Sequence, residues 1–348
     1  MDPLVLIFLT SGLFLGWALG ANDAANVFGT AVGTKMVSFR TAAIVCSVFV
    51  ILGALISGAG TSQTLGKLGA ISALPGAFMT ALAAAAAVFS MTKSDLPVST
   101  SQAIVGAIIG WNMFSGSPTD TSTLTKILIT WVLCPILAAI IAIILLKFVQ
   151  TLGRYSKLHM IRVDAYTRVA LILAGAFGAY ALGANNIANV VGVFIPAKPF
   201  PDISLGGFIF SSTQQLFLMG GLAIALGVFT YSKGVMMTVG GNLGRLSPTA
   251  AFVAVMAHSI VLFLFASRGL EAFLAGNGLP TIPLVPVSSS QAVVGAIVGI
   301  SILQGTQGIR WMTLGKIVAG WVATPFAAGI ICFIGLFFLQ NVFGLTVI

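Results

Sequence analysis

The stretch GANDAANVFG at residues 20–29 returns as GANNIANVVG at residues 183–192, with seven of the ten aligned positions identical. A second stretch, LPVSTSQAIVGAIIG at residues 96–110, returns as VPVSSSQAVVGAIVG at residues 285–299, with 11 of 15 positions identical. We call these two pairs the GAN motifs and the PVS motifs. A weaker third pair, at residues 126–140 and 316–330, keeps Lys, Trp and Pro in register. Three elements repeated in the same order divide the chain into two related halves.

The composition around these motifs is that of a membrane protein. Of the 348 residues, 58% are hydrophobic and only 7% are charged, whereas soluble domains are about 25% charged. Apolar runs recur at residues 41–58, 73–91, 127–146, 208–229, 250–266 and 317–339. Several reach the roughly 20 residues that a helix needs to cross a bilayer. We therefore predict an all-α polytopic membrane protein with about 10–12 transmembrane segments, including broken or re-entrant helices.

The basic residues indicate how the chain is oriented. The net charge of +9 comes from residues in the breaks between apolar runs, so it predicts membrane topology and not a nucleic-acid partner. The basic residues of the central break are Lys147, Arg154, Lys157, Arg162 and Arg168. By the positive-inside rule this break is cytoplasmic and both termini are outside the plasma or inner membrane.

The repeats and the charges together predict the domain organisation. Residues 1–150 form a first transmembrane repeat, residues 151–165 a basic cytoplasmic linker, and residues 166–348 a second repeat. A first half that starts outside and ends inside crosses an odd number of times, so the second half runs in the opposite sense. Such inverted repeats place substrate and coupling ion near the midplane, at the interface between the repeats.

Each PVS motif begins with proline followed by hydroxyl residues, which predicts the start of a helix at Pro97 and at Pro286. A helix N-terminus offers free backbone N–H groups and a positive dipole end, so it holds an anion without Arg or Lys. Two such starts that face each other would form a cradle for a tetrahedral oxyanion. The alternative is that the hydroxyls are ordinary helix caps.

The GAN motifs carry amide and carboxyl groups inside apolar runs. The residues are Asn22, Asp23 and Asn26 in the first half and Asn185, Asn186 and Asn189 in the second. Gly and Asn tolerate unwound backbone, whose carbonyl oxygens would suit a hard cation together with the side-chain oxygens. Asp23 aligns with Asn186, so only the first GAN motif carries an acid. Asp23 is therefore the candidate for the charged cation ligand or for a proton carrier. Close helix packing is the alternative for the glycines, but it does not explain the acid.

Other polar and sulfur-bearing residues carry less information. His258 lies in an apolar run and is expected to be a packed or hydrogen-bonded core residue and not a ligand. Cys46, Cys134 and Cys332 share no metal-like or disulfide-like spacing, so we expect small buried side chains.

The paired motifs resemble the signatures of the inorganic phosphate transporter (PiT) family over nearly the whole chain. The resemblance implies transport of inorganic phosphate with Na⁺ or H⁺ by alternating access, with no other cofactor. It gives the phosphate role to Ser99, Thr100, Ser101, Gln102, Ser288, Ser289, Ser290 and Gln291. It gives the cation and gating role to Asn22, Asp23, Asn26, Asn185, Asn186 and Asn189, with Na⁺ at Asp23, Asn26, Asn186 and Asn189. Many members carry Asp at both GAN motifs, so Asn186 leaves the number of cation sites open.

These observations favour a Na⁺-coupled phosphate symporter, with proton coupling through Asp23 as the rival. Transport of sulfate or of a metal–phosphate complex is a second alternative, because helix starts bind tetrahedral oxyanions generally. An anion channel is more remote, and an enzyme is not expected, since HExxH, GxSxG and P-loop patterns are missing. A homodimer formed through exposed apolar faces is compatible with the sequence.

Overall fold

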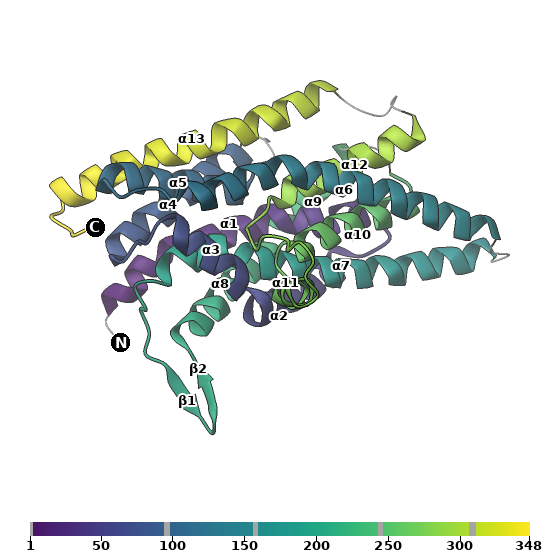
Figure 1. Ribbon diagram of the computed structural model, residues 1–348. Helices are drawn as coiled ribbons and strands as arrows, with labels where there is room; N and C mark the ends of the chain where they lie inside the picture. Colours follow the sequence, from purple (N-terminus) through teal and green to yellow (C-terminus); the bar gives the residue numbers. More distant parts are fainter. Residues whose placement is uncertain (1–2, 94–97, 156–158, 243–245, 306–310) are drawn as a thin grey trace.

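The computed structural model describes residues 3–93, 98–155, 159–242, 246–305 and 311–348, and it is almost entirely helical (Figure 1). The first half contains α1 (Pro3–Gly33), α2 (Phe39–Ser57), α3 (Ala59–Leu68), α4 (Leu74–Lys93), α5 (Thr100–Ser115) and α6 (Thr121–Tyr155). The second half contains α7 (Met160–Val191), η1 (Gly192–Phe194), β1 (Ile203–Leu205), β2 (Phe208–Phe210), α8 (Ser212–Thr230), α9 (Ser232–Asn242), α10 (Pro248–Leu264), α11 (Arg268–Gly276), α12 (Ser289–Gln304) and α13 (Trp311–Asn341).

The predicted membrane-spanning helices are present. In the described part of the chain, seven helices are long and apolar enough to cross a bilayer: α1, α2, α4, α6, α7, α8 and α13. The pair α10 and α11 would add an eighth span, bent by 63°. The PVS helices α5 and α12 are mostly buried, and with 16 residues each they are shorter than the roughly 20 residues of a full span. The protein is therefore an all-α polytopic membrane protein. The predicted number of about 10–12 transmembrane segments included short helices of this kind.

Equivalent helices of the two halves run in opposite directions. Figure 1 shows both chain ends at one end of the long helices, whereas α6 ends and α7 begins at the other end. Thus α1 runs opposite to its counterpart α7, and α6 runs opposite to its counterpart α13. The sequence-based prediction of two inverted repeats requires this arrangement.

The halves also exchange their packing partners. Gly106 of α5 lies against the backbone of Pro325 in α13, and its counterpart Gly295 of α12 lies against the backbone of Pro135 in α6. In both pairs a Cβ on the glycine would overlap the proline carbonyl oxygen, so only glycine permits this approach. The third sequence pair thus keeps its prolines in register because each one receives the PVS helix of the opposite half.

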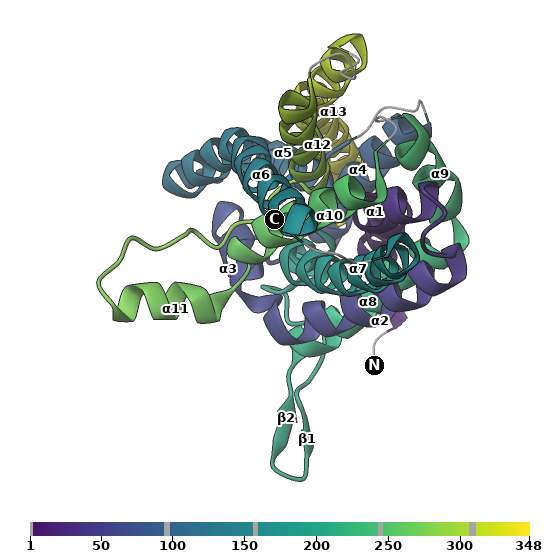
Figure 2. The same cartoon turned by 90° about the vertical axis from the view of Figure 1, so that its right-hand side faces the viewer.

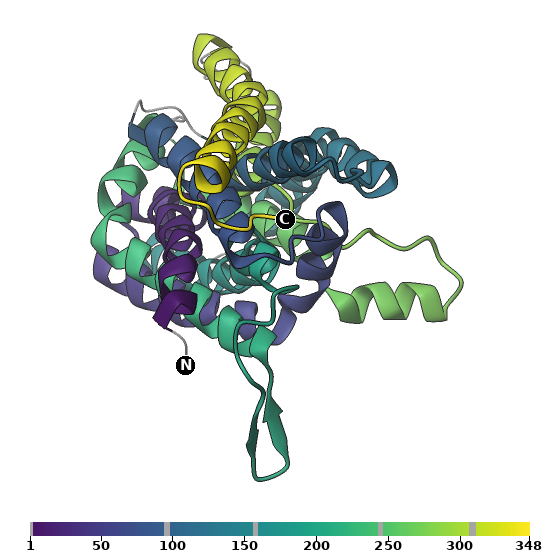
Figure 3. The ribbon, with the colours of Figure 1, turned by 90° about the vertical axis from the view of Figure 1, so that its left-hand side faces the viewer.

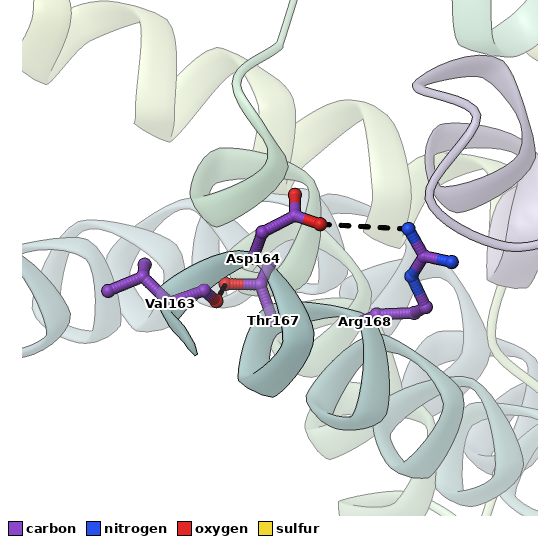
Figure 4. Close-up of polar contacts among 4 residues, drawn as sticks. All are labelled: Val163, Asp164, Thr167 and Arg168. Atoms are coloured by element: carbon purple, nitrogen blue, oxygen red, sulfur yellow. Dashed lines mark hydrogen bonds and ion pairs between the residues drawn. The ribbon is translucent and has the colours of Figure 1, made fainter. Parts of the chain in front are cut away.

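The basic segment between the halves is mostly helical. Within residues 151–165, α6 continues to Tyr155 and α7 starts at Met160, while residues 156–158 lie outside the described part. At the end of this segment, on the exposed start of α7, Arg168 pairs with Asp164 at 3.6 Å and the Thr167 hydroxyl donates to the Val163 carbonyl at 2.8 Å (Figure 4). Charged helix ends therefore extend beyond the apolar parts of α6 and α7.

Two elements project from the bundle. The β1–β2 hairpin pairs Ile203 with Phe210 and extends away from the helices (Figure 3). Helix α11, which has no buried residue, points outward at a different place (Figure 2). Neither element reaches the buried centre of the molecule, where the GAN and PVS motifs meet.

Candidate functional site

The GAN motifs lie within continuous helix, and not in unwound backbone as the sequence suggested. α1 is helical throughout residues 20–29, and α7 continues to Val191 before the short η1 turn. The backbone carbonyls of residues 20–29 are therefore within a helical hydrogen-bonding pattern, because α1 extends to Gly33. Asn22 is 8% exposed and the other five polar residues of the motifs are less exposed. Side-chain oxygens, and not unwound carbonyls, are what these motifs offer to a cation.

Each PVS motif starts a helix as predicted, but the helices begin after the prolines, at Thr100 and Ser289, and the serines before these residues act as caps. The Ser99 hydroxyl accepts from the backbone N–H of Gln102 at 3.3 Å, and the Ser288 hydroxyl accepts from that of Gln291 at 3.2 Å. Pro97 lies outside the described residues. The next two hydroxyls of each motif are also buried, so each helix start presents a compact polar surface inside the protein.

In the first contact between the halves, α1 meets α12. Asp23 Oδ1 accepts from Asn22 Nδ2 at 2.9 Å and from Asn26 Nδ2 at 3.3 Å. Asn26 Nδ2 also donates to Ser289 Oγ at 3.0 Å. One amide group therefore joins the carboxylate of the first GAN motif to a hydroxyl of the second PVS motif.

In the second contact, α7 meets α5 in a related way. Asn189 Nδ2 donates to Asn186 Oδ1 at 2.8 Å and to Ser101 Oγ at 2.9 Å. The Ser101 hydroxyl lies 3.3 Å from Asn186 Oδ1 and 2.9 Å from the carbonyl oxygen of Val287. Asn186 thus accepts at the place where Asp23 accepts, but without a negative charge. Each GAN motif contacts the PVS motif of the opposite half.

Asn185 contacts backbone rather than other motif side chains. Its Nδ2 donates to the carbonyl oxygen of Val285 at 3.2 Å, and its Oδ1 accepts from the backbone N–H of Val287 at 2.8 Å. Both ends of the amide are used on the segment that leads into α12. Asn185 therefore fixes the entry of the second PVS helix.

Several buried oxygens in this region have no protein hydrogen-bond partner. They are Thr100 Oγ1, Gln102 Oε1, Asn189 Oδ1 and Gln291 Oε1. Buried oxygens without donors, like the carboxylate oxygens of Asp23, match the preference of hard cations for oxygen ligands. Groups of three or more His, Cys, Asp or Glu that could hold a metal ion do not occur among the described residues. The chemistry therefore fits an alkali or similar hard cation better than zinc or iron.

The two glutamines occupy a different setting from the serines. Gln102 and Gln291 line a groove of about 920 Å³ between α6 and α13, together with Trp131, Trp321 and many aliphatic side chains. The groove is mostly apolar and includes strongly exposed side chains such as Phe326. An apolar groove does not solvate a dianion. The glutamines thus lie at the boundary between the polar centre and an apolar outer face.

The structure adds His258, which sequence reasoning placed in the core without a role. It is fully buried in α10, and its Nε2 lies 2.9 Å from Ser289 Oγ. Its position on a helix without a repeated motif hid this contact from the sequence. The expectation for the cysteines is confirmed: Cys46, Cys134 and Cys332 are free and buried.

The chain is similar along nearly its whole length to proteins that are named as phosphate permeases or transporters. One relative, named "Putative phosphate permease", comes from Methanocaldococcus jannaschii; it is 28% identical over 327 residues, which cover 94% of this chain and 95% of the relative. A second, "Inorganic phosphate transporter 2-1, chloroplastic" of Arabidopsis thaliana, is 22% identical over 418 residues, which cover 91% of this chain and 69% of the relative.

A solved structure shares the fold. The structure described as "The sodium-dependent phosphate transporter" superposes with a TM-score of 0.76 at 20% identity, over 97% of this chain and 98% of that one. The model of the phosphate transporter family (PHO4) matches residues 19–272 and 274–346, which include all four GAN and PVS motifs. Since that match spans both halves of the chain, the protein belongs to the phosphate transporter family, whose members are transporters and not enzymes.

Proposed function

We propose that the protein is a secondary active transporter that carries inorganic phosphate together with Na⁺ by alternating access. The observation that carries this proposal is the crossed contact of the motifs: Asn26 with Ser289 and Asn189 with Ser101. Each contact joins a candidate cation residue of one half to a candidate phosphate residue of the other. Binding of one ligand at such a contact changes the surroundings of the other, which is what coupled transport requires.

The anion part of the proposal places phosphate at the starts of α5 and α12. Thr100, Ser101, Ser289 and Ser290 supply buried hydroxyls, and the helix starts supply backbone N–H groups and positive dipole ends. Ser99 and Ser288 support this role by capping the helices. Gln102 and Gln291 would contribute from the groove side. Hydroxyl and N–H donors suit an anion that must later be released.

The cation part of the proposal centres on Asp23. The carboxylate of Asp23 is the acidic group of the four motifs, and Asn26 is held beside it. We place Na⁺ at Asp23 and Asn26, with Asn186 and Asn189 as a weaker, neutral counterpart. A bound cation offsets the buried carboxylate charge and lowers the repulsion that an entering phosphate would meet. Proton coupling through Asp23 is the second candidate, because the motifs hold one acid and not two.

The halves would rock against each other at the crossed contacts. In this account one state opens the centre outward and the other inward. The central basic segment faces the cytoplasm and both termini face outward across the plasma or inner membrane, in keeping with the positive-inside rule. Exposed apolar faces of α6 and α13 would allow a homodimer.

Removing single hydroxyls should weaken phosphate binding. We expect Ser101→Ala and Ser290→Ala each to raise the phosphate Kd by about 10-fold or more, because a hydrogen bond to a charged group contributes roughly 1.5–3 kcal/mol. Ser115→Ala, at the far end of α5, is the matched control and should bind as the wild type does. The measurement is titration of phosphate at saturating Na⁺. Unchanged affinity in both site variants would remove the serines from the phosphate site.

Accumulation of phosphate tests the transporter proposal itself. Reconstituted protein should concentrate labelled phosphate inside sealed vesicles above its external level when an ion gradient is imposed. Equilibration without accumulation would indicate an anion channel, since a channel has no stoichiometric coupling. Equal competition by sulfate would extend the substrate class to tetrahedral oxyanions generally.

A further inference from the structure

His258 is the ionisable side chain of α10 that touches the candidate phosphate site. The ring is fully buried, and Nε2 lies 2.9 Å from the hydroxyl of Ser289 at the start of α12. The same hydroxyl receives a hydrogen bond from Asn26 Nδ2 at 3.0 Å. A buried polar side chain is costly unless its hydrogen bonds contribute something, so this contact calls for a role.

The hydrogen bonds around Ser289 have a direction. The amide nitrogen of Asn26 can only donate, so Ser289 Oγ accepts there. His258 Nδ1 has no hydrogen-bond partner and is buried. A buried N–H without an acceptor is rarer than a buried acceptor without a donor. The tautomer with hydrogen on Nε2 is therefore favoured, and His258 donates to Ser289.

This direction leaves the hydroxyl hydrogen of Ser289 available. A hydroxyl oxygen has two acceptor sites and one donor. Asn26 and His258 fill both acceptor sites, so the hydroxyl can act toward a third group only as a donor. Two donors on the oxygen also polarise the O–H bond and strengthen it as a donor. A phosphate oxygen is an acceptor that such a hydroxyl would bind well.

The described residues of the first half show no equivalent of this arrangement. Thr100 aligns with Ser289, and its Oγ1 is buried with no hydrogen-bond partner. Helix α4, which packs against α1 and α5 as α10 packs against α7 and α12, has alanine at all of residues 83–87 and no ionisable residue before Lys93. The two helix starts are therefore alike in sequence but unlike in how their hydroxyls are held.

We propose that His258 is a positioning residue that holds the Ser289 hydroxyl as a hydrogen-bond donor to the transported anion, so that the second PVS motif binds phosphate more tightly than the first. The proposal deepens the function proposed above and rests on it. Asn26 extends the connection, because its amide also donates to Asp23 at 3.3 Å. The cation residue, the anion residue and His258 thus lie in one chain of hydrogen bonds.

Two amide substitutions separate a positioning role from a packing role. In His258→Gln the side-chain nitrogen can reach the place of Nε2, whereas in His258→Asn it reaches only the place of Nδ1. We expect His258→Gln to keep most of the phosphate affinity and His258→Asn to lose about 10-fold, the loss expected for one charge-directed hydrogen bond. Ser259→Ala, a neighbouring buried residue whose hydroxyl bonds only to the Val255 carbonyl, is the control. The measurement is phosphate titration at saturating Na⁺.

A double substitution tests whether His258 acts through Ser289. If it does, His258→Asn combined with Ser289→Ala should bind no more weakly than Ser289→Ala alone. If the losses of phosphate affinity in the two single variants multiplied in the double variant, the proposal would be overturned. Equal phosphate affinities of His258→Gln and His258→Asn, whether both low or both as in the wild type, would also overturn it. Failure of the wild type to bind or transport phosphate would instead contradict the proposed function.

Discussion

Asp23→Asn should abolish cation-driven phosphate uptake while the protein still folds. The change removes the one negative charge of the motifs and replaces one carboxylate oxygen, an acceptor, by an amide nitrogen, a donor. The amides of Asn22 and Asn26 already donate to the carboxylate of Asp23. Both effects disfavour a bound cation. We expect Na⁺-driven uptake to fall to the level of protein-free vesicles, because an intramembrane acid is by default a functional group. The measurement is initial uptake rate in proteoliposomes at matched protein content.

The second half supplies the control for this substitution. Asn186 occupies the equivalent position and accepts from Asn189 at 2.8 Å within an intact α7, so asparagine is compatible with the helix there. The Asp23→Asn protein should therefore elute and melt as the wild type does. A wild-type uptake rate in that variant would exclude Asp23 from the coupling mechanism.

Gly106→Ala and Gly295→Ala should each reduce stability strongly. A Cβ at either position would overlap the carbonyl oxygen of Pro325 or Pro135, which is backbone and cannot rotate away. Relief requires the helices to separate, at a cost of about 1–3 kcal/mol or more for an overpacked core. We expect lower yield and a lower midpoint of thermal unfolding for both variants.

Gly66→Ala and Gly315→Ala are the matched controls. At these helical positions a new Cβ meets nothing within 4 Å. Alanine is the better helix former, so these variants should be as stable as the wild type or slightly more stable. If Gly106→Ala and Gly295→Ala unfolded at the same temperature as the controls, the close contact of each PVS helix with the proline of the opposite half would be contradicted.

The broad organisation was predictable because it depends on patterns that repeat. Hydropathy predicted the helical membrane class, and the paired motifs predicted two related halves, the family and a helix start within each PVS motif. The third sequence pair, which keeps Lys, Trp and Pro in register, had no explanation from the sequence. Its explanation is a contact between halves, Gly106 with Pro325 and Gly295 with Pro135, which sequence spacing does not reveal.

Local features were missed for different reasons. The β1–β2 hairpin has a Gly206–Gly207 turn with φ of 53° and 95°. A Gly-Gly pair between apolar residues is a hairpin signal, but the sequence-based prediction for this region rested only on hydropathy. The GAN motifs were expected to unwind on composition, but both lie in continuous helix, and their amides bond to side chains of the same helix and to the PVS segments. His258 was undetectable as a site residue, since its partner Ser289 lies 31 positions away on another helix.

The most direct test of the account is uptake of labelled phosphate into proteoliposomes under an imposed inward Na⁺ gradient, beside a matched inward H⁺ gradient. The account predicts accumulation driven by Na⁺, which Asp23→Asn abolishes and excess sulfate leaves unchanged. Accumulation with H⁺ alone would contradict Na⁺ coupling and make Asp23 a proton carrier. Failure to accumulate phosphate with either gradient would contradict the proposed symport.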